Sequence, residues 1–203
     1  MSITLHHGDL PAGLDLGDTI AVDSETMGLQ GARDRLCVVQ LSAGDGNAHL
    51  VQLPQGDYAA PNLRHLLADP SRLKLFHYAR FDIGVLGRYL QVDCRPVYCT
   101  KIASRLARTY TDRHGLKDLV RELLGVELDK AEQSSDWGAD TLTATQQAYA
   151  ARDVLYLHEL RARLDFMLLR EGRTQLAQAC FEFLPTRVAL DLAGWPDQDL
   201  FAH

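Results

Sequence analysis

The sequence TIAVDSET, residues 19–26, begins as an apolar run and ends in two acids. Its first half predicts a β-strand over residues 19–22. Asp23 and Glu25 follow directly and lie two residues apart, so on an extended chain both side chains point to the same face. Two such carboxylates repel each other unless a cation lies between them. A D-x-E triplet alone is more often a solvated turn, but its position after an apolar strand indicates a pair of metal ligands.

The residues after this stretch predict an antiparallel meander. Residues 35–42 (RLCVVQLS) are rich in β-branched side chains and predict a second strand, residues 44–47 (GDGN) a turn, and residues 48–53 a third strand. Shorter elements follow: helices over residues 61–67, 80–90, 100–108 and 116–124, and strands over residues 73–76 and 96–98. Strands first, then strands mixed with helices, indicate an α/β domain with a mixed sheet.

The strongest helix signal begins at Thr143. Thr143 and Gln146 form a capping-box pattern, which predicts one helix from residue 144 to about residue 170. Tyr149 and Asp153 lie four residues apart and share one face of this helix, which should point inward. A buried aspartate is costly unless it is hydrogen-bonded or binds a metal, and a bond to Tyr149 or to an arginine is the alternative.

A further acid, Asp82, ends the sequence HYARFD, residues 77–82, between a predicted strand and a predicted helix. The helix dipole alone would favour an acid there. Carboxylate oxygens are also the ligands that Mg²⁺ or Mn²⁺ prefers, and two such ions can cleave a phosphodiester. A tyrosine such as Tyr149 can orient or deprotonate the attacking water. The candidate metal ligands are Asp23, Glu25, Asp82 and Asp153.

In this order, D-x-E, F-D and Y-x-x-x-D resemble the motifs of the DEDDy branch of the 3′–5′ exonucleases, and within it the ribonuclease D family. A sister branch carries a histidine five residues before the last aspartate, where this chain has Ala148. The resemblance covers roughly residues 15–165. The matching segments are residues 23–26, 77–82 and 149–154, with lesser matches at residues 39–41, 114–119 and 130–137.

The resemblance implies a ribonuclease H-like fold, a mixed central sheet flanked by helices, and two divalent metal ions, Mg²⁺ or Mn²⁺. It also implies hydrolysis from the 3′ end with release of nucleoside 5′-monophosphates. Asp23 would bridge both metals, and Glu25 and Asp153 would hold the metal that carries the nucleophilic water. Asp82 would support the second metal through water, and Tyr149 would position the attacking water.

By the same resemblance, Thr26 and Leu29 line the pocket for the terminal nucleotide, with Leu29 wedged against a base. His77, Phe81 and Lys130 complete the expected substrate-binding set, although core packing is an equal alternative for Phe81. The expected partner is a single-stranded nucleic acid 3′ end, RNA ahead of DNA, but no residue marks a reader of the 2′-hydroxyl. A catalytically silent nucleic-acid-binding domain on the same fold is the remaining alternative.

The charge of the chain fits an enzyme better than a coat protein. Its formal net charge is −6, and a protein that coats nucleic acid needs Lys and Arg for phosphate contacts. An exonuclease that holds one strand end needs few such contacts. The densest basic cluster contains Arg105, Arg108, Arg113 and His114. It is interpreted either as a solvated helix face or as a path for a single strand.

The length of 203 residues suits one domain. The expected domain is residues 1–203, with the motifs in about residues 15–165 and an extra helix at about residues 173–189. No apolar run approaches the roughly 20 residues of a membrane span and no secretory signal is present, so the expected location is the cytoplasm. The four cysteines form no CxxC pair, which predicts reduced thiols. The sequence leaves monomer and homodimer open.

Overall fold

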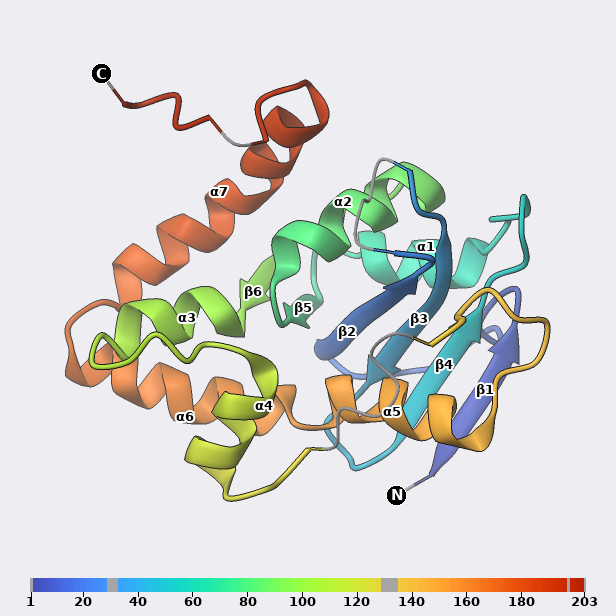
Figure 1. Ribbon diagram of the computed structural model, residues 1–203, viewed down its shortest axis with the longest axis horizontal. Helices are drawn as coiled ribbons and strands as arrows, with labels where there is room; N and C mark the ends of the chain where they lie inside the picture. The colour runs from blue at the N-terminus through green and yellow to red at the C-terminus, as the bar shows by residue number, and fades with distance from the viewer. Residues whose placement is uncertain (1, 29–32, 129–134, 197, 203) are drawn as a thin grey trace.

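A six-stranded mixed sheet forms the centre of the protein (Figure 1). The computed structural model describes residues 2–28, 33–128, 135–196 and 198–202. The strand order is β1-β4-β3-β2-β5-β6. The predicted antiparallel meander is confirmed as β2, β3 and β4, and β1, β5 and β6 add to it in parallel. The strands are β1 Ile3–His7, β2 Thr19–Thr26, β3 Leu36–Ser42, β4 Ala48–Gln52, β5 Leu73–Phe76 and β6 Val97–Cys99.

Two strands differ from the sequence-based expectation. The predicted strand over residues 19–22 continues to Thr26, because the acidic half of the stretch pairs with β3 in the register Asp23↔Gln40 and Glu25↔Val38. The strand β1 was not predicted, since ITLHH has few apolar residues. Its parallel pairing with β4 stabilises it, which is a tertiary contact that local propensity does not reveal.

Helices cover both faces of the sheet. Figure 1 shows α5 across one face, with α1 and α2 on the other. The main core lies between these layers and includes the fully buried Ile20, Val22, Leu75 and Phe76. The helices are α1 Pro61–Ala68, α2 Ala79–Leu90, α3 Thr100–Ala107, α4 Leu116–Leu119, the π-helical turn η1 Val120–Leu124, α5 Ala144–Leu155, α6 Leu157–Arg170 and α7 Thr174–Leu192. The predicted α/β fold with a mixed sheet flanked by helices is confirmed.

The prediction of a single helix over residues 144–170 is wrong in one respect. Its capping box is present, because the Thr143 side chain accepts from the Gln146 backbone and the Gln146 side chain accepts from the Thr143 backbone. However, the chain turns at Tyr156 and divides the segment into α5 and α6. The first part packs on β2, β3 and β4, and the second packs on α3 and β5. To pack on these two sets of partners, α5 and α6 must run in different directions. No glycine or proline marks the turn between them in the sequence.

The basic cluster around α3 is not one surface. Arg108 is fully buried, and its guanidinium donates to Ser104 Oγ (2.9 Å), to the Arg113 carbonyl (2.8 Å) and to the Glu122 carboxylate. Both interpretations of the cluster are therefore wrong for Arg108, which ties α3 to the loop that follows it. The four cysteines are free thiols, as predicted. None of the helices in the described residues is both long and apolar enough to cross a membrane.

Candidate active site

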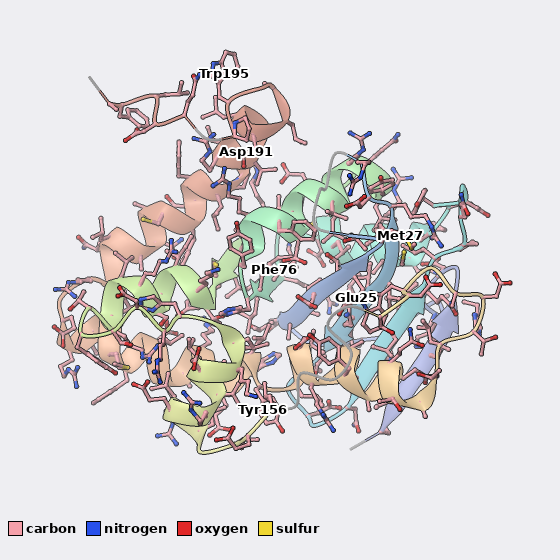
Figure 2. All side chains as sticks on the ribbon, in the orientation of Figure 1. Glu25, Met27, Phe76, Tyr156, Asp191 and Trp195 are labelled. Carbon is pink, nitrogen blue, oxygen red and sulfur yellow. The ribbon has the colours of Figure 1, made fainter. Side chains whose placement is uncertain are left out.

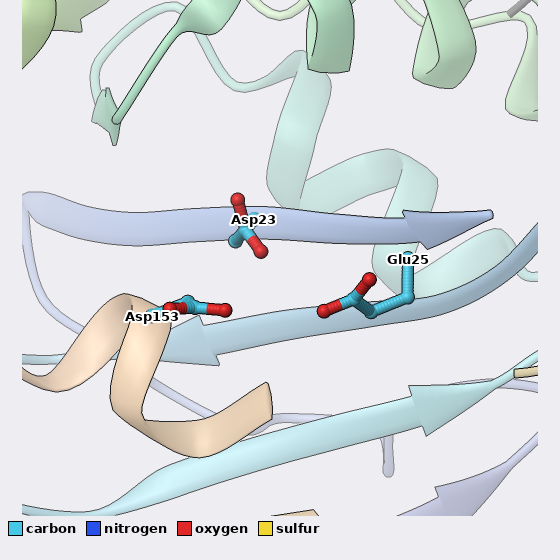
Figure 3. A group of neighbouring side chains, drawn as sticks. All are labelled: Asp23, Glu25 and Asp153. Atoms are coloured by element: carbon cyan, nitrogen blue, oxygen red, sulfur yellow. The ribbon is translucent and has the colours of Figure 1, made fainter. Parts of the chain in front are cut away.

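Three carboxylates meet between the sheet and α5. Asp23 and Glu25 come from β2 and Asp153 from α5, and one oxygen of each lies within 4.8 Å of the others (Figure 3). Strand alternation gives the two β2 acids the same face. The packing of α5 on that strand then brings Asp153 opposite them. The structure thus unites acids that are 128 or more residues apart in the sequence.

Asp82 approaches from α2 and lies beside this group. Its side chain is 3% exposed and accepts a hydrogen bond of 2.6 Å from Ser24 Oγ. It is not one of the three acids whose oxygens converge. Its charge nevertheless raises the pKa values of Asp23 and Glu25, so the four candidate metal ligands form one electrostatic unit.

Burial and mutual repulsion disfavour the ionised forms of these acids. Burial, followed by repulsion from the other three acids, raises the pKa of Asp23 well above its usual range. Burial and the charges of Asp153 and Asp82 raise the pKa of Glu25 to about 9. Burial is also the main reason that the pKa values of Asp82 and Asp153 rise to about 7. The nearby cation Arg152 offsets this rise only in part, at Asp153.

The donor set fits a divalent cation. All ligand atoms are carboxylate oxygens, which Mg²⁺ and Mn²⁺ prefer over nitrogen or sulfur. Ligands at about 2.1 Å from one Mg²⁺ lie up to about 4.2 Å apart, so a modest adjustment of oxygens spread over 4.8 Å accommodates an ion. The bound charge would also offset the repulsion that raises the pKa values.

Tyr149 lies one helical turn before Asp153 on α5. Its phenol pKa is raised far above the usual value, first by burial and then by the charges of Asp153, Glu25 and Asp23. The hydroxyl therefore stays protonated at neutral pH. The ring of Trp137 packs against the tyrosine, with ring centroids 6.0 Å apart. The structure thus places the phenol of Tyr149 beside Asp153, Glu25 and Asp23.

The expected substrate-binding residues have varied surroundings. Thr26 is buried, and its hydroxyl donates to the Gly28 carbonyl. His77 bonds to Thr100 Oγ1 through Nδ1 at 2.9 Å. Phe81 packs on the main core, in line with the alternative of core packing. Leu29 and Lys130 lie outside the described residues. The three described residues come from the end of β2, from the connection between β5 and α2, and from α2.

A hollow of about 310 Å³ lies beside the segment that carries Asp82. We call it the basic hollow; it is lined by Tyr78, Arg80, Cys99, Lys101, Ile102, Arg105, Cys180, Phe183, Leu184 and Arg187. Tyr78 is held in the left-handed region at φ 69°, and the Lys101 ammonium lies 4.0 Å from its ring centroid. The sequence motifs do not indicate this hollow, because residues of α3 and α7, which lie outside those motifs, form part of its lining.

Part of the basic hollow's positive charge is already paired. Asp191 binds both Arg80 and Arg187, at 2.5 and 2.7 Å. Figure 2 shows Asp191 and Trp195 near the C-terminal end of α7. Lys101 and Arg105 form no ion pair within the described residues. These two cations are therefore the groups of the hollow that are best placed for an anion.

Comparison with known proteins identifies the class. Residues 10–169 match the family model described as 3′–5′ exonuclease, and the chain belongs to this family. Ribonuclease D of Acidiphilium cryptum is 36% identical over 76% of this chain and 39% of its own length. Escherichia coli RNase D has 28% identity and a TM-score of 0.75, and the match covers 89% of this chain and 48% of that one. The chain spans about two fifths of the length of such curated relatives.

Other solved structures match the whole chain. Brucella melitensis NrnC with bound Mg²⁺ is 53% identical, has a TM-score of 0.96, and is covered completely, as is this chain. The same protein bound to pGG is 54% identical with the same TM-score. These likenesses extend over the full length of this chain and of NrnC, and they confirm the predicted ribonuclease H-like fold.

Proposed function

We propose that this protein is a metal-dependent 3′–5′ exonuclease that hydrolyses the terminal phosphodiester of RNA and releases nucleoside 5′-monophosphates. The observation that carries the proposal is the convergence of Asp23, Glu25 and Asp153 within 4.8 Å, one helical turn from Tyr149. Oxygen ligands of this kind suit the two-metal cleavage of phosphodiesters. The Mg²⁺ bound to NrnC supports the choice of ion.

Each residue has a role in this proposal. Bound divalent cations would supply the positive charge that activates the attacking water and stabilises the departing 3′-oxygen. Asp23, Glu25 and Asp153 would hold the ions, and Asp82 would support them from α2. Tyr149 would orient the attacking water by a hydrogen bond from its phenol, one helical turn from Asp153.

The substrate class that fits best is short RNA with a 5′-phosphate. The pGG bound to NrnC supports this choice. In this chain, Lys101 and Arg105 would hold a phosphate in the basic hollow. Tyr78 is exposed beside them and could stack on a base with the ring face that Lys101 does not cover. DNA ends are the alternative substrate, because no described residue stands out as a reader of the 2′-hydroxyl.

A time course on gels tests the proposal. The substrates are pGG, a longer 5′-labelled single-stranded RNA and their DNA counterparts, each with Mn²⁺, Mg²⁺ or EDTA. The proposal expects stepwise shortening from the 3′ end with either metal, faster on RNA than on DNA, and none in EDTA. If DNA were cleaved faster than RNA, DNA would be the substrate. Binding without cleavage in both metals would instead make the protein a nucleic-acid-binding domain.

A further inference from the structure

A glutamine side chain lies among the carboxylates. Gln40 is fully buried on β3 and pairs in register with Asp23 on β2. Its Nε2 lies 3.4 Å from Asp23 Oδ2 and 3.4 Å from Glu25 Oε1. An amide nitrogen carries two hydrogens, so one side chain can donate to both acids.

The orientation of this amide follows from its neighbours. Carboxylates that bind a metal ion are ionised and only accept hydrogen bonds, so in that state the NH₂ end faces them and the oxygen end faces elsewhere. Gln40 Oε1 is buried and has no hydrogen-bond partner among the described residues. An unpaired buried acceptor destabilises a fold. Core packing alone would be better served by an apolar residue, as at Val38, which lies two residues away on the same face of β3.

A second neutral donor serves Asp82. Ser24 lies between Asp23 and Glu25 on β2, is 7% exposed, and donates to Asp82 Oδ1 at 2.6 Å. Gln40 and Ser24 therefore give a donor to three of the four acids, each from a strand of the central sheet. A neutral donor fixes a carboxylate without the positive charge by which lysine or arginine would compete with a cation.

We propose that Gln40 and Ser24 are positioning residues that orient the carboxylates of Asp23, Glu25 and Asp82 for divalent cations. A hydrogen bond to one lone pair restrains the rotation of the carboxylate and leaves other lone pairs for the ion. This inference rests on the proposed function, since it assigns the two residues to the same metal site.

The test is direct Mn²⁺ binding to the intact chain, followed by the electron paramagnetic resonance signal of free Mn²⁺. Gln40→Met removes both donors at similar size, and Ser24→Ala removes the hydroxyl. Each should weaken Mn²⁺ binding by about tenfold or more, a typical effect of losing a partner of a metal ligand. Ser24→Thr keeps the hydroxyl and should restore binding. In pGG cleavage, excess Mn²⁺ should recover most of the lost rate.

Two buried residues on neighbouring strands are matched controls. Gln52 on β4 donates to the carbonyls of Ala139 and Asp140, and Ser42 on β3 donates to the Asn47 carbonyl. Gln52→Met and Ser42→Ala remove the same groups away from the acids and should leave the Mn²⁺ affinity unchanged.

The outcomes separate this inference from the proposed function. Wild-type affinity in Gln40→Met and Ser24→Ala, in a chain that binds Mn²⁺ and cuts RNA, overturns the inference alone. A wild-type chain that neither binds Mn²⁺ nor cuts overturns both. If Gln40→Met does not fold by circular dichroism, the comparison of Ser24→Ala with Ser24→Thr and Ser42→Ala decides the question.

Discussion

Electrostatic repulsion among the four acids of the site destabilises the metal-free protein. Burial raises the pKa of each, and the charges of its neighbours add to the rise for Asp23 and Glu25. Replacement of a single acid therefore has opposite effects on activity and on the stability of the metal-free protein. This opposition distinguishes a metal ligand from a residue that only supports the fold.

Asp153→Asn should abolish turnover and leave the fold intact. The amide removes one charge from the cluster. The free energy of unfolding of the metal-free protein should therefore rise by about 1 kcal/mol, which corresponds to a Tm roughly 2–4 °C higher. Activity on pGG and thermal unfolding in EDTA at pH 8 measure the two effects. An active variant, or one that is strongly destabilised, would contradict the assignment of Asp153.

Tyr149→Phe should lower the rate of cleavage by roughly 10²- to 10⁴-fold, because the phenyl ring has no hydroxyl to hold the attacking water in line. The phenyl ring keeps the contact with Trp137, so thermal stability and Mn²⁺ affinity should change little. Single-turnover cleavage at saturating Mn²⁺ measures the effect. A variant that cuts at the wild-type rate removes Tyr149 from the mechanism.

The stability of the metal-free protein should fall as the pH rises. The folded-state pKa of Glu25 is about 9, and those of Asp82 and Asp153 are about 7, all above their unfolded values near 4. Such groups stabilise the fold fully below pH 4 and lose this contribution as the pH passes through 7 to 9. Unfolding scans from pH 5 to 9 in EDTA should show the decrease, and Mn²⁺ should reduce it. A Tm in EDTA that rises over this range would contradict the burial of these acids.

At the scale of elements, α3 separates two kinds of arginine that look alike in the sequence. Arg105 and Arg108 both belong to the predicted basic cluster, yet Arg108 is fully buried with Ser104 and Glu122, and Arg105 is exposed at the basic hollow. Sequence spacing does not distinguish them, because the loop that closes over Arg108 is a tertiary feature.

Arg108→Leu should destabilise the protein by about 2–3 kcal/mol, since it leaves buried hydrogen-bond partners unpaired. Arg105→Leu should stay within about 0.5 kcal/mol, as expected for an exposed position, and should instead raise the KM for pGG. Urea unfolding and steady-state kinetics on both variants check this contrast. Equal stabilities of the two variants would refute the buried network around Arg108.

Prediction of the elements was accurate where local signals were strong. The capping box at Thr143 and the β-branched strand β3 were both recognisable from short sequence patterns. By contrast, β1 depends on its pairing with β4, and the turn at Tyr156 depends on two helices with different packing partners. Local propensity carries no information about either of these tertiary contacts.

At the scale of the whole molecule, the sequence predicted the acids but only part of their arrangement. Strand alternation predicted that Asp23 and Glu25 share a face. The approach of Asp153 requires the packing of α5 on the sheet, for which the family resemblance was the only guide. Ser24 and Gln40 were not predicted as site residues, although a glutamine within the apolar run of β3 was a visible signal.

The central claim is that metal held by these acids drives cleavage from the 3′ end. The most direct measurement is the identity of the first product released from a 3′-labelled single-stranded RNA, with Mn²⁺ and with EDTA. The account predicts a labelled nucleoside 5′-monophosphate at the earliest time points with Mn²⁺, and no product in EDTA or with Asp153→Asn. A longer labelled fragment as the first product, or release that continues in EDTA, would contradict it.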